Sequence, residues 1–176
     1  MSRSALVVID VQQAMFADAK NQPHDGEAVV ARIAELIAQA RAANAPIFFV
    51  QHDGGPEDPW FQAGTPMFAY HPKVAPRDGD DVTVKRFSSA FHATDLDTKL
   101  KRAGVDHLVV TGMQSEYCVD SCVRGAYERG YGLTLVADAH STLDTPAARA
   151  PDIIAIQNQT LDGSFACVIP AAKVKF

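Results

Sequence analysis

Short apolar runs alternate with longer segments of helical periodicity along this chain. Five runs of five or six residues are rich in β-branched and aromatic side chains and are bounded by turn-forming residues. Such runs are typical of strands that are buried on both faces of a parallel sheet. They lie at residues 5–10, 46–50, 107–112, 133–138 and 165–170, and a shorter run at 82–85 is a sixth strand candidate.

The segments between these runs carry apolar residues at helical spacing. They predict helices at 26–44, 93–104 and 118–130, with a weaker one at 145–159. Gly104 and Gly130 stand where glycines commonly end a helix, and Pro151 interrupts the fourth pattern. Strands that alternate with helices form βαβ crossovers. The pattern therefore predicts an α/β fold, a three-layer α/β/α sandwich with a mostly parallel six-stranded sheet and helices on both faces.

Composition narrows the classes of protein. A chain of 176 residues, 47% of them hydrophobic, can bury one core, so we expect a single domain over 1–176. The net charge of −5 and the absence of a basic cluster exclude a typical nucleic-acid binder. No apolar run approaches the roughly 7–15 residues of a secretion signal or the ~20 of a membrane span. We therefore expect no membrane contact and a cytoplasmic location.

Three groups of different chemistry follow predicted strands. Asp10 ends the first run, Lys85 ends the short run at 82–85, and Cys118 comes shortly after the run at 107–112. Each has an ordinary explanation, namely a turn cap, a solvated lysine and a buried thiol. In open parallel sheets, however, ligands bind outside the carboxyl ends of the strands. The three side chains are therefore candidates for one site at that edge.

The three cysteines do not make a disulfide framework, and we expect them to be free thiols. Cys122 lies on a helical apolar stripe and Cys167 lies inside a predicted strand, so both are interpreted as core residues. Cys118 would lie in the first turn of its helix if Ser115 is the cap. There the helix dipole and a nearby lysine would lower the thiol pKa and favour a nucleophile, and free amides could bind an oxyanion.

Four blocks of the chain resemble a known family. They are "VIDVQ" (8–12), "VTVKRFSSAF" (82–91), "VVTGMQSEYCV" (109–119) and "GYGLTLVADAHST" (130–142). In order and spacing they resemble the isochorismatase-like cysteine hydrolases, which include nicotinamidases, N-carbamoylsarcosine amidases and ureidoacrylate amidases. The resemblance covers nearly the whole chain.

The resemblance implies a catalytic triad of Asp10, Lys85 and Cys118. It also implies a cis peptide bond between Met113 and Gln114, and an oxyanion hole formed by the backbone N–H groups of Gln114 and Cys118. The implied reaction is hydrolysis of a C–N bond (amide, carbamoyl or ureido) of a small molecule through a thioester on Cys118. Asp10 would serve as general base and acid, with Lys85 assisting.

The chain departs from the nicotinamidase pattern at its metal motif. Nicotinamidases carry Asp-x-His after the second strand, and here Asp53 is followed by Gly55 in place of the histidine. His52 and His71 are the remaining metal-ligand candidates, in a different register. We therefore expect no metal and no cofactor, and keep a metal-dependent nicotinamidase-type enzyme as an alternative. Isochorismatases that cleave a vinyl ether lack the nucleophilic cysteine, so Cys118 argues against that reaction.

Aromatic side chains near the catalytic edge are candidates for a substrate pocket, with ordinary packing as the alternative. The candidates are Phe16, Trp60, Phe61, Phe68, Phe91 and Tyr117. Trp60 is favoured first, because it lies in the Gly/Pro-rich segment 51–80, and long loops inside compact domains are usually functional. Phe91 is favoured next, as the last residue of the "VTVKRFSSAF" block. The set suggests a small, largely apolar pocket for a flat or compact substrate. Polar contacts could come from Gln12 or Glu116, whereas His140 and Asp138 are expected to stabilise their loop.

Two other classes of function stay open. A catalytically silent relative that serves in binding or assembly would be expected to lack one of the triad residues, and all three are present. A redox sensor would need a resolving cysteine, and the neighbouring Cys122 is expected to point into the core. By resemblance, the chain is expected to form a homo-oligomer, a dimer or a tetramer.

Overall fold

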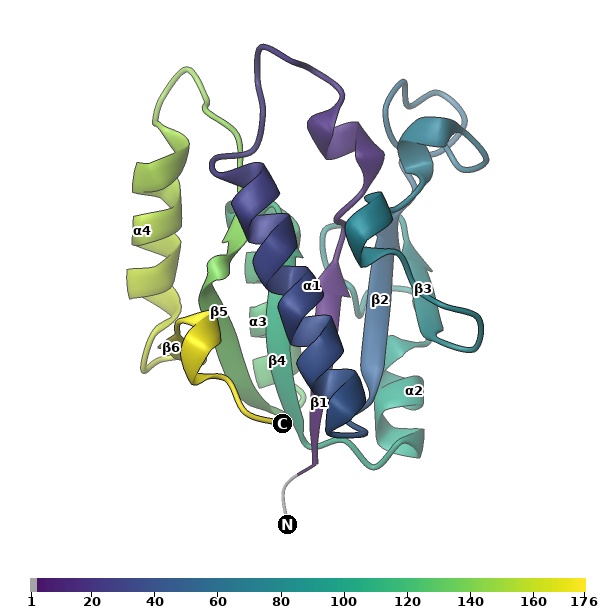
Figure 1. Ribbon diagram of the computed structural model, residues 1–176, viewed down its shortest axis with the longest axis vertical. Helices are drawn as coiled ribbons and strands as arrows, with labels where there is room; N and C mark the ends of the chain where they lie inside the picture. The colour runs from purple at the N-terminus through teal and green to yellow at the C-terminus, as the bar shows by residue number, and fades with distance from the viewer. Residues whose placement is uncertain (1–2) are drawn as a thin grey trace.

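A computed structural model describes residues 3–176 as an open sheet flanked by helices (Figure 1). The strands are β1 (Ser4–Ile9), β2 (Ile47–His52), β3 (Asp81–Lys85), β4 (His107–Met113), β5 (Gly132–Ser141) and β6 (Cys167–Ile169). The helices are α1 (Gly26–Ala42), α2 (Leu96–Arg102), α3 (Asp120–Tyr127) and α4 (Ala150–Leu161). The strand order is β3-β2-β1-β4-β5-β6, and the pairings of neighbouring strands are parallel. The predicted six-stranded parallel sheet is therefore confirmed.

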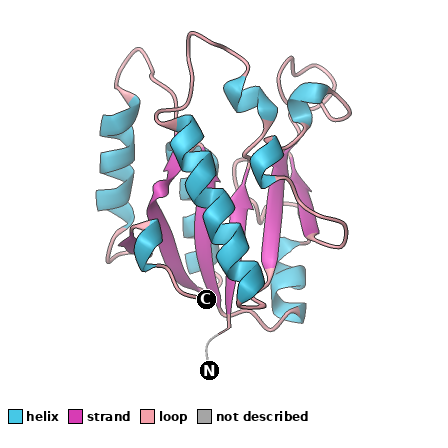
Figure 2. Ribbon diagram, viewed as in Figure 1, coloured by secondary structure: helices cyan, strands magenta, loops and turns pink. Residues whose placement is uncertain are grey.

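The two faces of the sheet have separate cores. Along β1, Val7 and Ile9 pack with residues of α2 and α3, whereas Leu6 and Val8 pack with the apolar stripe of α1. This alternation follows from the pleat of a strand, which directs successive side chains to opposite faces. Helix α1 crosses one face, and α2 and α3 lie behind the sheet (Figures 1 and 2). Helices on both faces are thus confirmed.

Two details of the sequence interpretation are wrong. Cys167 is exposed, because β6 is a three-residue strand at the edge of the sheet, while Cys122 is fully buried as expected. Pro151 does not disturb the fourth helix. It lies in the first turn of α4, where its missing N–H has no intrahelical partner to lose.

The carboxyl ends of the central strands lie close together at one edge. Asp10 directly follows β1, Lys85 ends β3, and β4 ends at Met113. Gly112 permits the close approach of β4 to β1, since it has a φ of 127° and a Cβ there would collide with the backbone of Ile9. Among residues 3–176, no helix is long and apolar enough to cross a membrane.

Candidate active site

Three side chains from three separate elements meet at the carboxyl edge of the sheet. The ammonium Nζ of Lys85 lies 2.7 Å from Oδ2 of Asp10. The same ammonium donates a hydrogen bond to Sγ of Cys118 at 3.1 Å. The structure thus brings together the carboxylate, the ammonium and the thiol that the sequence placed at the ends of different strands.

Burial separates the roles of these groups. The side chains of Asp10 and Lys85 are 0% exposed, whereas Cys118 is partly exposed. Lys85 also donates to the carbonyl of Phe87 at 3.1 Å, and its Nζ lies 3.4 Å from Nδ1 of His52. The ammonium is therefore held from several sides. Of the three, the thiol is the group that an incoming molecule can reach.

The pKa shifts describe a neutral thiol beside a buried ion pair. Burial raises the pKa of Asp10, and the attraction of Lys85 offsets only part of that effect. Burial opposes the charge of Lys85, but Asp10 and the thiol raise its pKa overall. Burial and the adjacent carboxylate raise the pKa of Cys118 to about 12. The expectation of a lowered thiol pKa is therefore wrong, because burial and the carboxylate outweigh the lysine.

Cys118 lies in a single π-helical turn that precedes α3. This turn, η4 (Ser115–Val119), is closed by hydrogen bonds from the N–H groups of Tyr117 and Val119 to the carbonyl of Gln114, at 3.2 and 3.1 Å. The peptide bond between Met113 and Gln114 is cis. Ser115 does not cap the helix as proposed from the sequence. It is the first residue of the π-helical turn, and Gln114 holds the capping position.

Ser115 instead belongs to a buried hydrogen-bond network that sequence reasoning missed. Its Oγ lies 2.7 Å from Nδ1 of His140, and Nε2 of His140 lies 2.9 Å from Oδ1 of Asn158. Asn158 donates through Nδ2 to the carbonyl of Ala137, which orients its Oδ1 toward the imidazole. The imidazole then carries its proton on Nε2 and accepts from Ser115. The network connects the η4 turn to β5 and α4. In the sequence, the "DAHST" block, which contains His140, is the only sign of it.

A cavity of 250 Å³ adjoins this turn. Its apolar lining is Ala14, Met15, Trp60, Phe61 and Leu143, and its polar lining is Asp18, Asn21 and Gln114. Trp60, favoured from the sequence, is among these residues, and so is Phe61. Apart from Gln114, the remaining lining residues were missed, because they lie in short irregular segments with no periodic pattern, namely Ala14, Met15, Asp18, Asn21 and Leu143.

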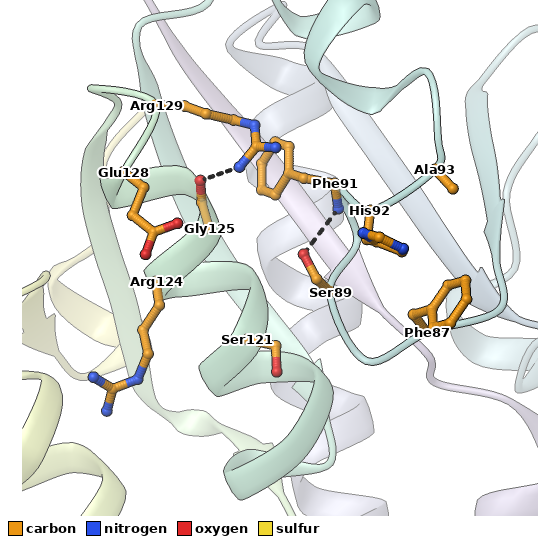
Figure 3. Close-up of a pocket in the computed structure, with 10 residues that line it drawn as sticks. All are labelled: Phe87, Ser89, Phe91, His92, Ala93, Ser121, Arg124, Gly125, Glu128 and Arg129. Atoms are coloured by element: carbon orange, nitrogen blue, oxygen red, sulfur yellow. Dashed lines mark hydrogen bonds between the residues drawn. The ribbon is translucent and has the colours of Figure 1, made fainter.

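The other aromatic candidates do not line this cavity. Phe16 packs beside it against the ring of His71, at 5.0 Å between centroids, and Tyr117 is 53% exposed. Phe91 is buried in the core, stacked on Tyr131 and covered by the guanidinium of Arg129. It borders a different hollow, between α3 and the 87–93 segment, as Figure 3 shows. Its role as a wall of the substrate pocket stays a prediction.

Two polar candidates, Gln12 and Asp53, form hydrogen bonds that hold the backbone of the 51–80 segment. Gln12 is buried and exchanges hydrogen bonds with the backbone of His52 and Phe68. The carboxylate of Asp53 accepts from the N–H groups of Gly55 and Ala63 and pairs with Arg86 at 2.8 Å. These contacts fix the start of the long loop, so Gln12 and Asp53 position the walls of the site.

The remaining metal-ligand candidates lie apart. His52 faces Lys85, whereas His71 lies 3.5 Å from Glu27 and accepts from the backbone N–H of Lys73. Within residues 3–176 there is no group of three or more His, Cys, Asp or Glu side chains arranged to hold a metal ion. The expectation of no metal stays a prediction.

Sequence comparison finds the same family that the motifs resemble. The isochorismatase domain model matches residues 4–161. Isochorismatase family protein YddQ of Bacillus subtilis is 38% identical over 79% of this chain and 78% of its own. Streptothricin hydrolase of Streptomyces noursei is 39% identical over 85% of this chain, which spans 52% of that protein. Ureidoacrylate amidohydrolase RutB of Methylobacterium radiotolerans is 32% identical over 76% of this chain and 65% of its own.

Structure comparison agrees with the sequence. A cysteine hydrolase from Pseudomonas syringae superposes with a TM-score of 0.88 at 26% identity, covering 97% of this chain and 90% of its own. The fold, the matched domain and the sequence relatives all lead to one assignment. This chain belongs to the isochorismatase family of hydrolases.

Proposed function

We propose that this protein is a cysteine hydrolase that cleaves a C–N bond, in an amide, carbamoyl or ureido group, of a small molecule. One observation carries the proposal. A partly exposed thiol, Cys118, touches a fully buried carboxylate–ammonium pair. Gln114, at the start of the turn that carries the thiol, lines a cavity of 250 Å³. A base, a cation and a nucleophile in contact are the groups that acyl transfer to sulfur requires.

The proposed first step is attack by the thiol on the substrate carbonyl. Asp10 accepts the thiol proton, and its raised pKa makes it a stronger base than an ordinary aspartate. Lys85 donates to the sulfur and so stabilises the thiolate as it forms. The backbone N–H groups of Gln114 and Cys118 would hold the oxyanion. Asp10 then protonates the departing amine or ammonia, which leaves a thioester.

The second step returns the enzyme to its starting state. Asp10, now ionised again, would take a proton from water as the water attacks the thioester carbonyl. The sulfur leaves and takes its proton from Asp10, and the acid departs. It is a carboxylic acid if the substrate is an amide and a carbamic acid if the substrate is a carbamoyl or ureido compound. Names of relatives support this class of reaction, since they include an amidohydrolase, a cysteine hydrolase and streptothricin hydrolase. Homo-oligomer formation stays a prediction.

A panel of small primary amides, carbamoyl compounds and ureido acids tests the proposal. We expect ammonia release from at least one class, together with an acylated Cys118 peptide in mass spectra of rapidly quenched reactions. Exposed Cys167 should stay unmodified in the same digests and serves as the internal control. Turnover without any acyl group on Cys118 would contradict the thioester route.

The pH dependence of kcat/KM should follow the ionisation of the buried Asp10 rather than the ionisation of the Cys118 thiol. Because burial raises the pKa of Asp10, its ionised form is lost at a higher pH than the ~3.9 of an ordinary aspartate. We expect kcat/KM to fall on the acid side with a midpoint above that value and to be flat from neutral pH to about 9. A rate that rises with a midpoint near ~8.5, the pKa of an ordinary cysteine, would show that free thiolate limits the reaction.

A further inference from the structure

The cavity beside the turn that carries Cys118 has an acidic lining residue. Asp18 is the ionisable side chain among its lining residues, and in the described part of the chain no lysine, arginine or histidine lines it. Asp18 is exposed, and its Oδ1 accepts from the backbone N–H of Lys20. Lys20 itself is exposed and does not line the cavity.

A second carboxylate, that of Glu116, belongs to the same turn as Cys118. Glu116 follows the lining residue Gln114 by two positions, and its Oε1 accepts from Thr142, which immediately precedes the lining residue Leu143. Its Oε2 is buried and has no hydrogen-bond partner. Glu116 does not line the cavity itself, but its carboxylate keeps one unused acceptor beside the chain segments that do.

The nearby catalytic groups do not reverse this charge. Lys85 is buried and paired with Asp10 at 2.7 Å, so the pair is neutral as a whole. Arg86 is likewise paired with Asp53. A substrate carboxylate entering the cavity would thus meet Asp18 with no unpaired cation to receive it.

The aromatic side chains that line the cavity favour a positively charged group on the substrate. Trp60 is 48% exposed and lines the cavity together with Phe61. The faces of aromatic rings attract cations, tryptophan most strongly, and they also accept flat groups by stacking. Carboxylates and aromatic faces together make a surface that binds an ammonium, a guanidinium or a protonated ring.

From these contacts we propose that the cavity selects cationic amides and disfavours carboxylates, with Asp18 as the residue that determines this specificity. The inference rests on the proposed function, because it assumes that the cavity delivers the substrate to Cys118. It narrows the substrate class to small, flat compounds that carry their positive charge away from the scissile carbonyl.

Charged thiol reagents test the cavity without any knowledge of the substrate. Methanethiosulfonates bearing a trimethylammonium, a methyl or a sulfonate group each form a mixed disulfide with the thiol and release methanesulfinate. The rate at Cys118 is read by peptide mass spectrometry. We expect the cationic reagent to react faster than the anionic one, the Asp18→Asn variant to reduce this ratio about tenfold, and Asp18→Lys to invert it.

Two controls isolate the effect. Asp78→Asn makes the same charge change at an exposed loop residue outside the cavity, and should leave the ratio at Cys118 unchanged. Exposed Cys167 reports the reagent reactivities within the same molecule. An unchanged ratio in Asp18→Asn, or an equal change in Asp78→Asn, would overturn the inference. If the ratio behaves as expected but the amide panel gives no ammonia, the proposed function fails and the charge selection stands.

Discussion

Replacing Cys118 by serine is expected to abolish hydrolysis, with a loss in kcat of about 10⁴-fold or more, by analogy with the removal of other covalent nucleophiles. A serine hydroxyl is a far weaker acid than a thiol, and the buried carboxylate of Asp10 is not basic enough to ionise it. Cys118→Ala removes the nucleophile altogether and should lose as much. Initial rates on a substrate from the amide panel, followed by ammonia release, measure the loss.

The fold should survive both changes. Cys118 is only partly buried and the replacements are smaller or isosteric, so the midpoint of thermal unfolding should stay close to that of the wild type. Cys167→Ser changes the same chemical group at the exposed sheet edge and should retain full activity. A Cys118→Ser variant that keeps a tenth or more of the wild-type rate would refute nucleophilic catalysis by this residue.

The sheet could be predicted from the sequence because its strands are buried on both faces. Each run had to be continuously apolar and β-branched, which is a local signal that needs no knowledge of neighbours. The edge strand β6 shows where this reasoning fails. Its run resembles a buried strand, but an edge strand has only one neighbour, so Cys167 is exposed. Burial at an edge is decided by what lies beside it in space.

The meeting of Asp10, Lys85 and Cys118 could be anticipated because parallel strands all end at the same side of a sheet. The cavity could not be, since its lining comes from loops whose conformation depends on distant hydrogen bonds. Gln12, for example, holds the backbone at His52 and Phe68. The thiol pKa was misjudged for a related reason. Sequence places the lysine nearby, but it reveals neither how deeply the thiol is buried nor that the carboxylate of Asp10 lies beside it, and these two effects raise the pKa of Cys118.

The Asp10–Lys85 ion pair, proposed to activate the thiol, is also expected to control stability. Replacing Lys85 by methionine, which has a similar length and no charge, should lower the free energy of unfolding by about 3–5 kcal/mol at neutral pH, because a carboxylate with 0% exposure then loses its counter-ion. Activity should be lost as well. Chemical denaturation measures the stability. As a matched control, Lys101→Met breaks a 2.6 Å ion pair with Asp97 on the exposed surface and should cost no more than about 1 kcal/mol.

The stability deficit of Lys85→Met should depend on pH in a defined direction. Without the lysine, the pKa of Asp10 in the folded protein lies still further above its unfolded value of about 3.9. At pH values above about 4, Asp10 ionises freely in the unfolded chain but only at a cost in the folded protein, so the unfolded state is favoured there. The deficit is therefore largest at neutral pH and shrinks as the pH falls toward about 4.

The double variant Asp10→Asn/Lys85→Met separates charge from function. Asparagine tolerates the left-handed backbone of Asp10, whose φ is 50°, and no uncompensated charge is left in the core. We expect this variant to recover most of the lost stability and to lose the pH dependence, while remaining inactive because it has no base. A Lys85→Met protein as stable as Lys101→Met at neutral pH would show that the buried carboxylate does not need its partner. The balance of charges that makes Asp10 a strong base would then have to come from elsewhere in the site.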